Sequence, residues 1–275
     1  MTPAPQQNDR SEEALSPPTS AAAATRREGQ AQAVAFFQDQ AKQTLGLTLS
    51  ARQSESFAWY LDELLRRNSQ QNLTAIVDPQ GIVVKHFLDS LTLVAYLGPA
   101  ASVRLVDVGT GAGFPGLPLR IVCPGLRLVL VEATAKKAEF CRQVAAGLAL
   151  NEVEVIHARA EEMGHDPRHR ERYDAATGRA VAALPVLVEY LLPLVRVGGR
   201  VLAQKGENGP AEAHQAQRAL ELLGGSLRQL HPIELPGVAE RRYIIEIEKT
   251  AATPEAYPRR PGLPAKRPLL ASADR

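Results

Sequence analysis

A run of glycines after an apolar segment constrains this chain more than any other feature. In "RLVDVGTGAGFPGLPL", residues 104–119, a strand-like run reaches Asp107 and four glycines follow within eight residues, at positions 109, 111, 113 and 116. An apolar, helix-like segment resumes directly afterwards. Glycine lets the backbone turn and approach a ligand without a Cβ clash. In an open α/β sheet, ligands bind outside the carboxyl ends of the strands, so this loop is the expected cofactor cradle.

Two cofactors fit this loop. Gly111-x-Gly113-x-x-Gly116 matches the dinucleotide fingerprint, whereas Asp107-x-Gly109-x-Gly111-x-Gly113 matches the loop of enzymes that use S-adenosylmethionine. A carboxylate beside a pyrophosphate at a helix N-terminus adds like-charge repulsion of about 1–4 kcal/mol at intermediate dielectric. S-adenosylmethionine carries a sulfonium and an ammonium group and no phosphate, so an acidic rim attracts it. Asp107 therefore favours S-adenosylmethionine, although a structural role as a cap stays open.

The order of the predicted elements gives the fold class. From residue 103, short runs rich in Val, Leu and Ile alternate with helical segments. We expect helices at about 115–123, 134–149, 184–195 and 210–223. No helix separates the last two strands, so they pair as antiparallel neighbours. The pattern predicts an α/β, Rossmann-like class I methyltransferase fold with a seven-stranded, mostly parallel sheet and an antiparallel last strand. The expected strands are 103–108, 127–132, 153–158, 173–177, 199–204, 226–234 and 242–248.

The parts outside this sheet differ in composition. The first thirty residues contain almost no large apolar side chain and predict a disordered tail. A helix from Gln32 that ends at Gly46, and a second helix behind a capping box of Ser50 and Gln53, predict a small helical cap. We therefore expect a tail, a helical cap, a methyltransferase domain and a basic, proline-rich C-terminal segment, at residues 1–30, 31–98, 99–250 and 251–275.

Composition excludes several classes of protein. The net charge of +2 is too small to indicate a nucleic-acid partner by itself. The two cysteines, Cys123 and Cys141, form no Cys-x-x-Cys motif, and His165 and His169 lie in a solvated loop, so we expect neither a disulfide framework nor a metal site. No run approaches the roughly 20 apolar residues that a membrane span needs. We expect a cytoplasmic protein with no membrane partner.

Polar residues follow the later predicted strands, where they face the same cleft. Glu132 can accept hydrogen bonds from both ribose hydroxyls of either cofactor, so it does not separate the two candidates. Ala160 and Glu161 lie where an adenine is expected, and Glu161 can accept from the exocyclic amine. Arg179 can hold a substrate phosphate or the target base, or bind a helix end, and these readings stay open. Lys205, after the fifth strand, has the same ambiguity.

Several segments together resemble one known family. They are "NLTAI", "VVKHFLDSL", "LVDVGTGAGFPGLPL", "YDAATGRAVAALP", "LAQKG" and "YPRRPGLPAKRPL". The chain is similar, over about residues 32–270, to the ribosomal RNA small subunit methyltransferase G family, also called glucose-inhibited division protein B. The glycine loop is typical of a whole superfamily, whereas "VVKHFLDSL" and the basic, proline-rich C-terminal segment are specific to this family.

The resemblance implies an activity and a cofactor site. The family transfers a methyl group from S-adenosylmethionine to N7 of one guanine in the decoding region of bacterial 16S rRNA. The implied partner is this RNA, in the small ribosomal subunit or an assembly intermediate, and we expect a monomer. Carried over by motif and joined to the residues above, the expected cofactor site comprises Asp107, Gly109, Gly111, Gly113, Phe114, Glu132, Ala133, Thr134, Ala160, Glu161 and Arg179.

The implied substrate needs little acid–base chemistry. Guanine N7 has a lone pair and no proton, so catalysis reduces to alignment and electrostatics, and we expect Arg179 and Lys205 near the target base. For RNA binding we expect Asn72, Lys85, His86, Arg259, Arg260, Lys266 and Arg267. Two alternatives stay open: an NAD-dependent oxidoreductase that uses Gly111-x-Gly113-x-x-Gly116, and a non-catalytic RNA- or ribosome-binding protein.

Overall fold

The computed structural model describes residues 20–98 and 103–270. The first nineteen residues of the expected tail lie outside the described residues, as do residues 271–275 of the C-terminal segment. In the described part, no helix is long and apolar enough to cross a membrane.

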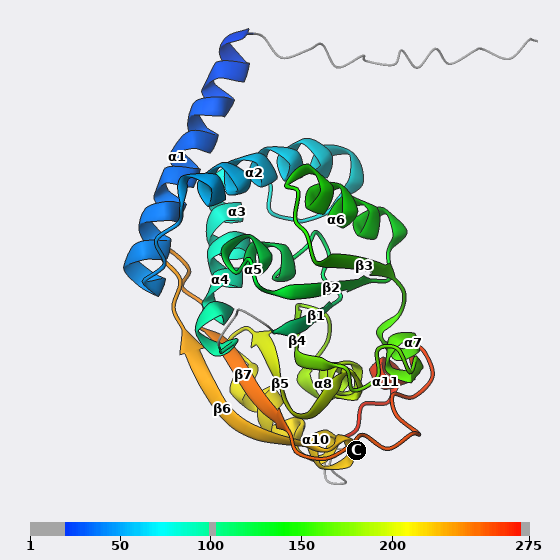
Figure 1. Ribbon diagram of the computed structural model, residues 1–275. Coiled ribbons are helices and arrows are strands. Elements are labelled where there is room, and N and C mark those ends of the chain that lie inside the picture. Colours follow the sequence, from blue (N-terminus) through cyan, green and yellow to red (C-terminus); the bar gives the residue numbers. More distant parts are fainter. Residues whose placement is uncertain (1–19, 99–102, 271–275) are drawn as a thin grey trace, which may run out of the picture.

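A seven-stranded sheet forms the centre of the molecule (Figure 1). The strand order is β3-β2-β1-β4-β5-β7-β6, and β7 alone runs antiparallel to its neighbours. This arrangement confirms the expected fold class, and all seven strands occur close to their predicted bounds. They are β1 (Arg104–Val108), β2 (Arg127–Glu132), β3 (Val153–His157), β4 (Tyr173–Arg179), β5 (Val195–Lys205), β6 (Gly225–Ile233) and β7 (Arg242–Lys249).

Alternate residues of the central strands are buried in two separate hydrophobic cores, one on each face of the sheet. Leu105 of β1 and Leu128 of β2 are buried with the cap, α5 and α6, whereas Val106 and Val129 are buried with the helices of the opposite face. This period of two explains why the strands are apolar throughout, since both faces of the sheet are covered. The covering helices are α5 (Gly116–Val122) and α6 (Ala135–Gly147) on one face, and α8 (Leu184–Leu191), α9 (Gly209–Gln215) and α10 (Gln217–Leu223) on the other.

Two of these helices differ from the sequence prediction. The predicted helix at 184–195 ends at Leu191 and continues as a 3-10 turn, η3 (Leu192–Leu194), and the predicted helix at 210–223 is divided at Ala216 into α9 and α10. Two short helices were not predicted: α7 (Ala160–His165), after β3, and α11 (Leu263–Lys266), in the C-terminal segment.

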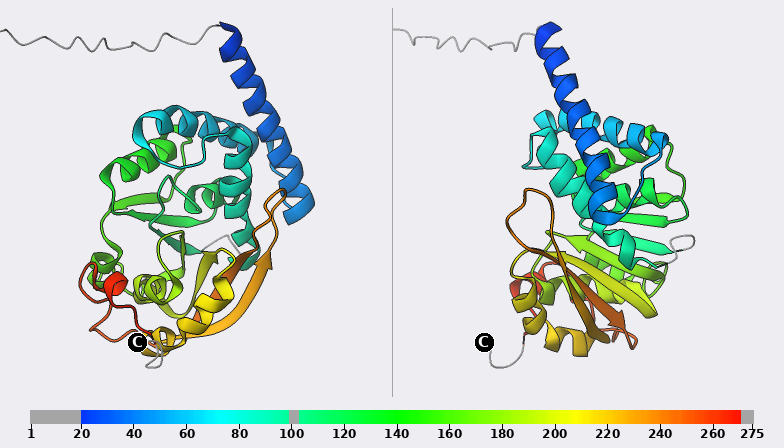
Figure 2. Two further views of the ribbon diagram at one scale, coloured as in Figure 1. Left: turned by 180° about the vertical axis from the view of Figure 1, so that it is seen from behind. Right: turned by 90° about the vertical axis from the view of Figure 1, so that its left-hand side faces the viewer.

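The N-terminal cap is built from helices stacked beside α5 and α6 (Figures 1 and 2). Its first helix begins at Ser20, twelve residues before the predicted start at Gln32, because the alanine-rich sequence there has a high helix propensity. Gly46 follows the end of α1 with a positive φ of 66°, and Ser50 and Gln53 form the predicted capping box. The elements are α1 (Ser20–Leu45), α2 (Ala51–Gln71), α3 (Pro79–Ile82), the π-helical turn η1 (Val83–Leu88), α4 (Asp89–Leu91) and the 3-10 turn η2 (Thr92–Tyr96).

Candidate cofactor and substrate site

The glycine loop lies between β1 and α5, at the carboxyl edge of the sheet. Gly109 has a φ of 68° and its N–H donates to Val131 O at 2.8 Å, so the loop is fixed against β2. A Cβ at Gly109 would lie 2.6 Å from the Val181 side chain, which requires glycine there. Gly111 also has a positive φ, of 62°, but a Cβ there would meet nothing within 4 Å. The loop is therefore packed on one side and open at Gly111.

Asp107 lies under the loop and not on its rim. Its side chain is fully buried, and Oδ2 accepts hydrogen bonds from Thr110 Oγ1 at 2.7 Å and from Gly116 N at 2.9 Å. Burial raises the pKa of Asp107 to about 6, against the lowering effect of these two hydrogen bonds. The second oxygen, Oδ1, is buried with no hydrogen-bond partner among the described residues. Asp107 thus caps the loop, which is the structural role that the sequence left open. Its Oδ1 remains available as a hydrogen-bond acceptor.

The start of α5 offers no free amide to a phosphate. Gly116 N–H is bonded to Asp107, Leu117 N–H donates to Gly113 O at 2.8 Å, and Pro118 has no N–H. A dinucleotide pyrophosphate binds helix N-terminal amides, and here it would also meet the Asp107 carboxylate below. This geometry disfavours the NAD alternative, although the Gly111-x-Gly113-x-x-Gly116 spacing fits it.

Glu132 at the end of β2 is tied to the glycine loop. Its Oε2 accepts from Gly111 N at 2.9 Å and its Oε1 from Thr134 N at 2.7 Å, and the residue is buried to 7% exposure. Each carboxylate oxygen has a second lone pair, so these two bonds orient Glu132 and leave capacity for two hydroxyl donors. Ala133 and Thr134 are exposed beside it.

Phe114 is held in an aromatic stack that joins the loop to the cap. Its ring stacks on His86 with centroids 4.5 Å apart and on Tyr60 at 5.4 Å, and the Arg179 guanidinium carbon lies 5.4 Å from its centroid. The Tyr60 hydroxyl donates to the carbonyl oxygen of Ala112, in the same loop. The position of the loop therefore depends on α2, which sequence reasoning did not connect to it.

Arg179 is fixed between the sheet and the cap. Its Nη1 donates to Asp89 Oδ2 at 2.7 Å and to Lys85 O at 3.0 Å, and only 11% of its side chain is exposed. Arg242, at the start of β7, also approaches Asp89 Oδ2, at 3.5 Å. Gln204 Nε2 of β5 donates to Asp89 O at 2.7 Å. Three strand ends therefore hold Asp89, and through it the "HFLDSL" segment, at the edge of the sheet.

His86 is neutral. Arg179 Nη2 donates to its Nδ1 at 3.1 Å, so the ring proton is on Nε2, which donates to Thr74 Oγ1 at 2.7 Å. Burial, with the Arg179 charge acting in the same direction, lowers the pKa of His86 to about 3. His86 therefore adds no positive charge for RNA phosphate, which differs from its expected role and follows from its burial and from the arginine beside it.

The Lys205 ammonium makes its polar contacts with other residues of the protein. Its Nζ lies 2.7 Å from Glu212 Oε2 and donates to Ala182 O, and only 8% of its side chain is exposed. Glu212 Oε2 also accepts from Leu184 N at 2.7 Å. Lys205 therefore fixes the loop between β4 and α8, and its ammonium is not directed at open solvent.

The C-terminal segment, whose basic residues were expected to bind RNA, packs onto the domain. Arg259 Nη2 lies 2.6 Å from Oε2 of Glu189, whose side chain is fully buried in α8. Glu161, expected at the adenine, is itself 3% exposed and its Oε1 accepts from Gly262 N at 2.9 Å. Arg259 is thus occupied by a carboxylate, and we no longer expect it to bind RNA phosphate.

The other predicted RNA-binding residues have accessible side chains. These are Asn72, Lys85, Arg260, Lys266 and Arg267. Ala160 lies at the start of α7, beside Glu161.

Sequence reasoning missed Tyr60, Asp89, Gln204 and Arg242. Asp89 lies in the "HFLDSL" segment that carried the resemblance, and an acidic residue in an apolar helical stretch was the one available signal. Among the described residues, no three His, Cys, Asp or Glu side chains are grouped to hold a metal ion.

Comparison with known proteins gives a consistent result. A family model described as rRNA small subunit methyltransferase G matches residues 53–240. The ribosomal RNA small subunit methyltransferase G of Roseiflexus sp. (strain RS-1) is 52% identical over 224 residues, which are 82% of this chain and 95% of the relative. That of Desulfitobacterium hafniense (strain Y51) is 44% identical over 229 residues, 83% of this chain and 95% of the relative. The family-model match includes the glycine loop and the strands β1 to β6, and excludes α1 and β7.

Proposed function

The chain belongs to the ribosomal RNA small subunit methyltransferase G family, and from this we propose that it transfers a methyl group from S-adenosylmethionine to N7 of a guanine in 16S rRNA. The family supports methyl transfer to small-subunit ribosomal RNA. The choice of guanine N7 in the decoding region rests on the sequence resemblance and on the chemistry of the cleft.

The observation that carries the cofactor assignment is Asp107. Among the described residues, one oxygen of this buried carboxylate has no hydrogen-bond partner, and the loop above it leads into a helix whose first N–H groups are already bonded. Such a site attracts a cation and repels a phosphate. S-adenosylmethionine, when bound, supplies an electrophilic methyl group on a positively charged sulfur. Glu132, oriented by Gly111 and Thr134, is placed to accept hydrogen bonds from the ribose hydroxyls.

The residues at the cleft edge act by position and charge. Arg179 is a fixed cation next to Phe114, and Lys205 holds the loop between β4 and α8. His86 is neutral with both ring nitrogens bonded, so it is not free to act as a base. Guanine N7 carries no proton, and a reaction that removes none needs no base. Catalysis then consists of holding N7 in line with the methyl group in a preorganised field.

For the RNA we propose an approach across the cap and the C-terminal segment. A groove of about 980 Å³ is lined by residues of α1 and α2 and by the loop that follows α2, and includes Asn72 and Thr74. Thr74 accepts the hydrogen bond from His86, so this groove borders the Arg179 network. On the other side, Arg260, Lys266 and Arg267 are exposed cations suited to phosphate.

The test separates the proposal from its rivals. Purified protein is titrated with S-adenosylhomocysteine and with NADH by calorimetry, and then incubated with labelled S-adenosylmethionine and small ribosomal subunits that lack this methyl group. We expect heat with S-adenosylhomocysteine, none with NADH, and label in 16S rRNA. Binding of NADH alone would favour the oxidoreductase, and RNA binding without label under every substrate preparation would favour a non-catalytic binding protein.

A further inference from the structure

The C-terminal strap, defined here as Thr253–Gly262, follows β7 and lies beyond residue 240, where the family match ends. It returns along the short helix α7 toward the carboxyl edge of the sheet (Figure 1). Because α7 carries Glu161, the course of the strap bears on the expected adenine site.

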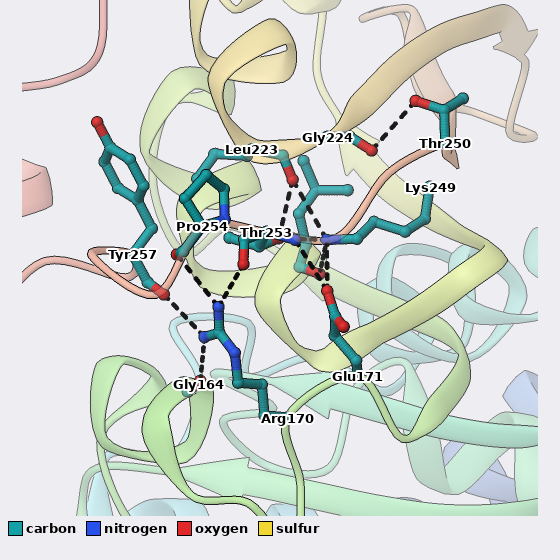
Figure 3. Close-up of polar contacts among 11 residues, drawn as sticks. Gly164, Arg170, Glu171, Leu223, Gly224, Lys249, Thr250, Thr253, Pro254 and Tyr257 are labelled. Carbon is teal, nitrogen blue, oxygen red and sulfur yellow. Dashed lines mark hydrogen bonds and ion pairs between the residues drawn. The ribbon is translucent and has the colours of Figure 1, made fainter.

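The far end of the strap is bound by two cationic side chains, the half-buried Arg170 and the fully buried Lys249 (Figure 3). Arg170 donates to four carbonyl oxygens, those of Gly164, Tyr257, Thr253 and Pro254, at 2.7, 2.8, 2.6 and 3.2 Å. Lys249, which is fully buried, donates to Leu192 O at 2.9 Å, to Leu223 O at 3.2 Å and to Thr253 Oγ1. Burial lowers the pKa of Lys249 to about 8.

The near end of the strap is tied to both ends of α7. At the C-terminal end of the helix, His165 Nε2 lies 2.6 Å from Pro258 O, and a Cβ on Gly164 would lie 2.6 Å from the Pro258 ring. At the N-terminal end, Gly262 N–H donates to Glu161 Oε1 at 2.9 Å. An isolated helix shorter than about 12–15 residues has little stability in water, and α7 has only six residues, so its position depends on such contacts.

The middle of the strap is latched to α8. Arg259 donates to Glu189 through its backbone N at 2.8 Å, through Nε at 2.9 Å and through Nη2 at 2.6 Å. The Glu189 side chain is fully buried, and the neighbouring Tyr190 has a raised pKa because of burial and of the carboxylates of Glu161 and Glu189. The latch and the adenine-site carboxylate are therefore within electrostatic reach of one ring.

The latch, defined here as the Arg259–Glu189 pair, is close to Gly262 in the chain. Only Arg260 and Pro261 separate Gly262 from Arg259, and Leu263 N donates to Arg260 O at 3.0 Å, which closes a turn. Pro258, Pro261 and Pro264 limit the backbone freedom of this turn. Gly262 itself has a φ of 79°, so the direction of its N–H is set by the turn.

We propose that the strap is part of the cofactor site, and that Arg259 and Glu189 are positioning residues that hold Glu161 at the adenine edge. Through the Gly262 hydrogen bond, one oxygen of Glu161 is fixed so that the carboxylate can read the exocyclic amine of adenine. This inference rests on the proposed S-adenosylmethionine-dependent function and adds to it a source of selectivity for the adenine base.

The variants must loosen the latch without unfolding the protein. Arg259→Ala would leave Glu189 buried and unpaired, which is costly, so it is not the first choice. Glu189→Gln removes the buried charge and keeps the shape, and leaves the half-buried Arg259 with an amide oxygen as its acceptor. Arg259→Lys keeps the positive charge and loses the bidentate contact with the Glu189 carboxylate. Arg127→Lys, at an exposed position of β2 away from the strap, is the matched control.

The readout is base discrimination measured in the full chain. Calorimetry gives the dissociation constants of S-adenosylhomocysteine and of S-inosylhomocysteine, in which a carbonyl oxygen replaces the exocyclic amine. The wild type and Arg127→Lys should prefer the adenine form by about 10- to 100-fold, as expected for a hydrogen bond to a charged group. In Glu189→Gln and Arg259→Lys this ratio should fall toward one, and amide hydrogen exchange in residues 258–263 should become faster.

The outcomes separate the inference from the function beneath it. A ratio that stays at the wild-type value in both variants, even with weaker binding overall, overturns the positioning role, because a merely structural strap weakens both ligands equally. A wild type that binds both ligands equally overturns it as well. A wild type that binds neither ligand overturns the proposed function itself, and the inference with it.

Discussion

The Asp89 carboxylate lies 2.7 Å from Nη1 of Arg179, and this ion pair joins the cap to the end of β4. Asp89 is 3% exposed at its side chain, and Arg242 approaches the same oxygen at 3.5 Å. Two cations thus converge on one buried carboxylate at the edge of the cleft. The pair fixes the direction of the guanidinium that lies against Phe114.

Replacing Asp89 should damage both stability and methyl transfer. Asp89→Asn keeps the shape but leaves two partly buried arginines without their anion, so we expect the free energy of unfolding to fall by about 1–3 kcal/mol. Urea unfolding measures this loss, and methyl transfer to RNA should fall at saturating cofactor because Arg179 is no longer fixed. Asp39→Asn, at an exposed site of α1, is the matched control and should change neither. A wild-type rate in Asp89→Asn would contradict the positioning of Arg179.

Asp107 should oppose folding of the cofactor-free protein above pH 6. Its pKa is raised from 3.8 to about 6, so between these values the folded state binds the proton and the unfolded state does not. Stability contributed by this group therefore falls as pH rises from about 4 to about 6, by an amount on the order of 3 kcal/mol.

Asp107→Asn should remove that pH dependence, because the amide oxygen can still accept from Thr110 and Gly116. At pH 7 we expect the variant to be more stable than the wild type in urea unfolding and to bind S-adenosylhomocysteine more weakly. Equal stability of the two proteins from pH 4 to pH 7 would show that the carboxylate is not desolvated.

His86 should have the opposite effect. Its pKa is lowered from 6.5 to about 3, so between these values the unfolded state binds a proton that the folded state does not. Stability from this group is complete above pH 6.5 and is lost as pH falls toward 3, on the order of a few kcal/mol.

His86→Gln isolates that contribution, because the glutamine amide can donate to Thr74 and accept from Arg179. The stability difference between wild type and variant, measured by urea unfolding, should shrink or change sign on acidification from pH 6.5 to pH 4. The opposing effect of Asp107 cancels in this difference. A difference that is constant over this range would contradict a buried, neutral His86.

Sequence patterns predicted what is local and periodic in this fold. The alternation of apolar runs with helical segments and the absence of a helix between β6 and β7 predicted the sheet, and Ser50 with Gln53 predicted the start of α2. The position of Glu132 at the end of β2, and that of Glu161 shortly after β3, followed from the same order of elements. These features depend on residues that are close together in the chain, so they can be predicted from a single sequence.

Contacts distant in sequence were not predictable in this way. Asp89 and Arg179 are 90 residues apart, and Arg259 and Glu189 are 70 apart. The composition of a charged, proline-rich segment indicates solvent exposure. Arg259 departs from this expectation because it pairs with the buried Glu189, which is distant in the sequence. The loss of charge at His86 likewise depends on burial by the fold and on Arg179, which lies on another element.

The exposed cations of the C-terminal segment should contact RNA. The double variant Arg260→Ala, Lys266→Ala removes two cations without touching Arg259, so RNA affinity should fall and the slope of its logarithm against the logarithm of salt concentration should decrease by about 1–2. Filter binding over a salt series measures this slope. Affinity for S-adenosylhomocysteine should stay at the wild-type value, and a loss of cofactor binding instead would place these residues in the packed part of the strap.

Methyl transfer mapped at nucleotide resolution tests the central claim most directly. The protein is incubated with labelled S-adenosylmethionine and small ribosomal subunits that lack the modification, and the RNA is then cleaved at 7-methylguanosine by borohydride reduction and aniline. We predict one cleavage, at a guanine in the decoding region of 16S rRNA, with label in 7-methylguanosine. Label at another atom or another site, or S-adenosylhomocysteine binding with no label in any form of the RNA, would contradict the account.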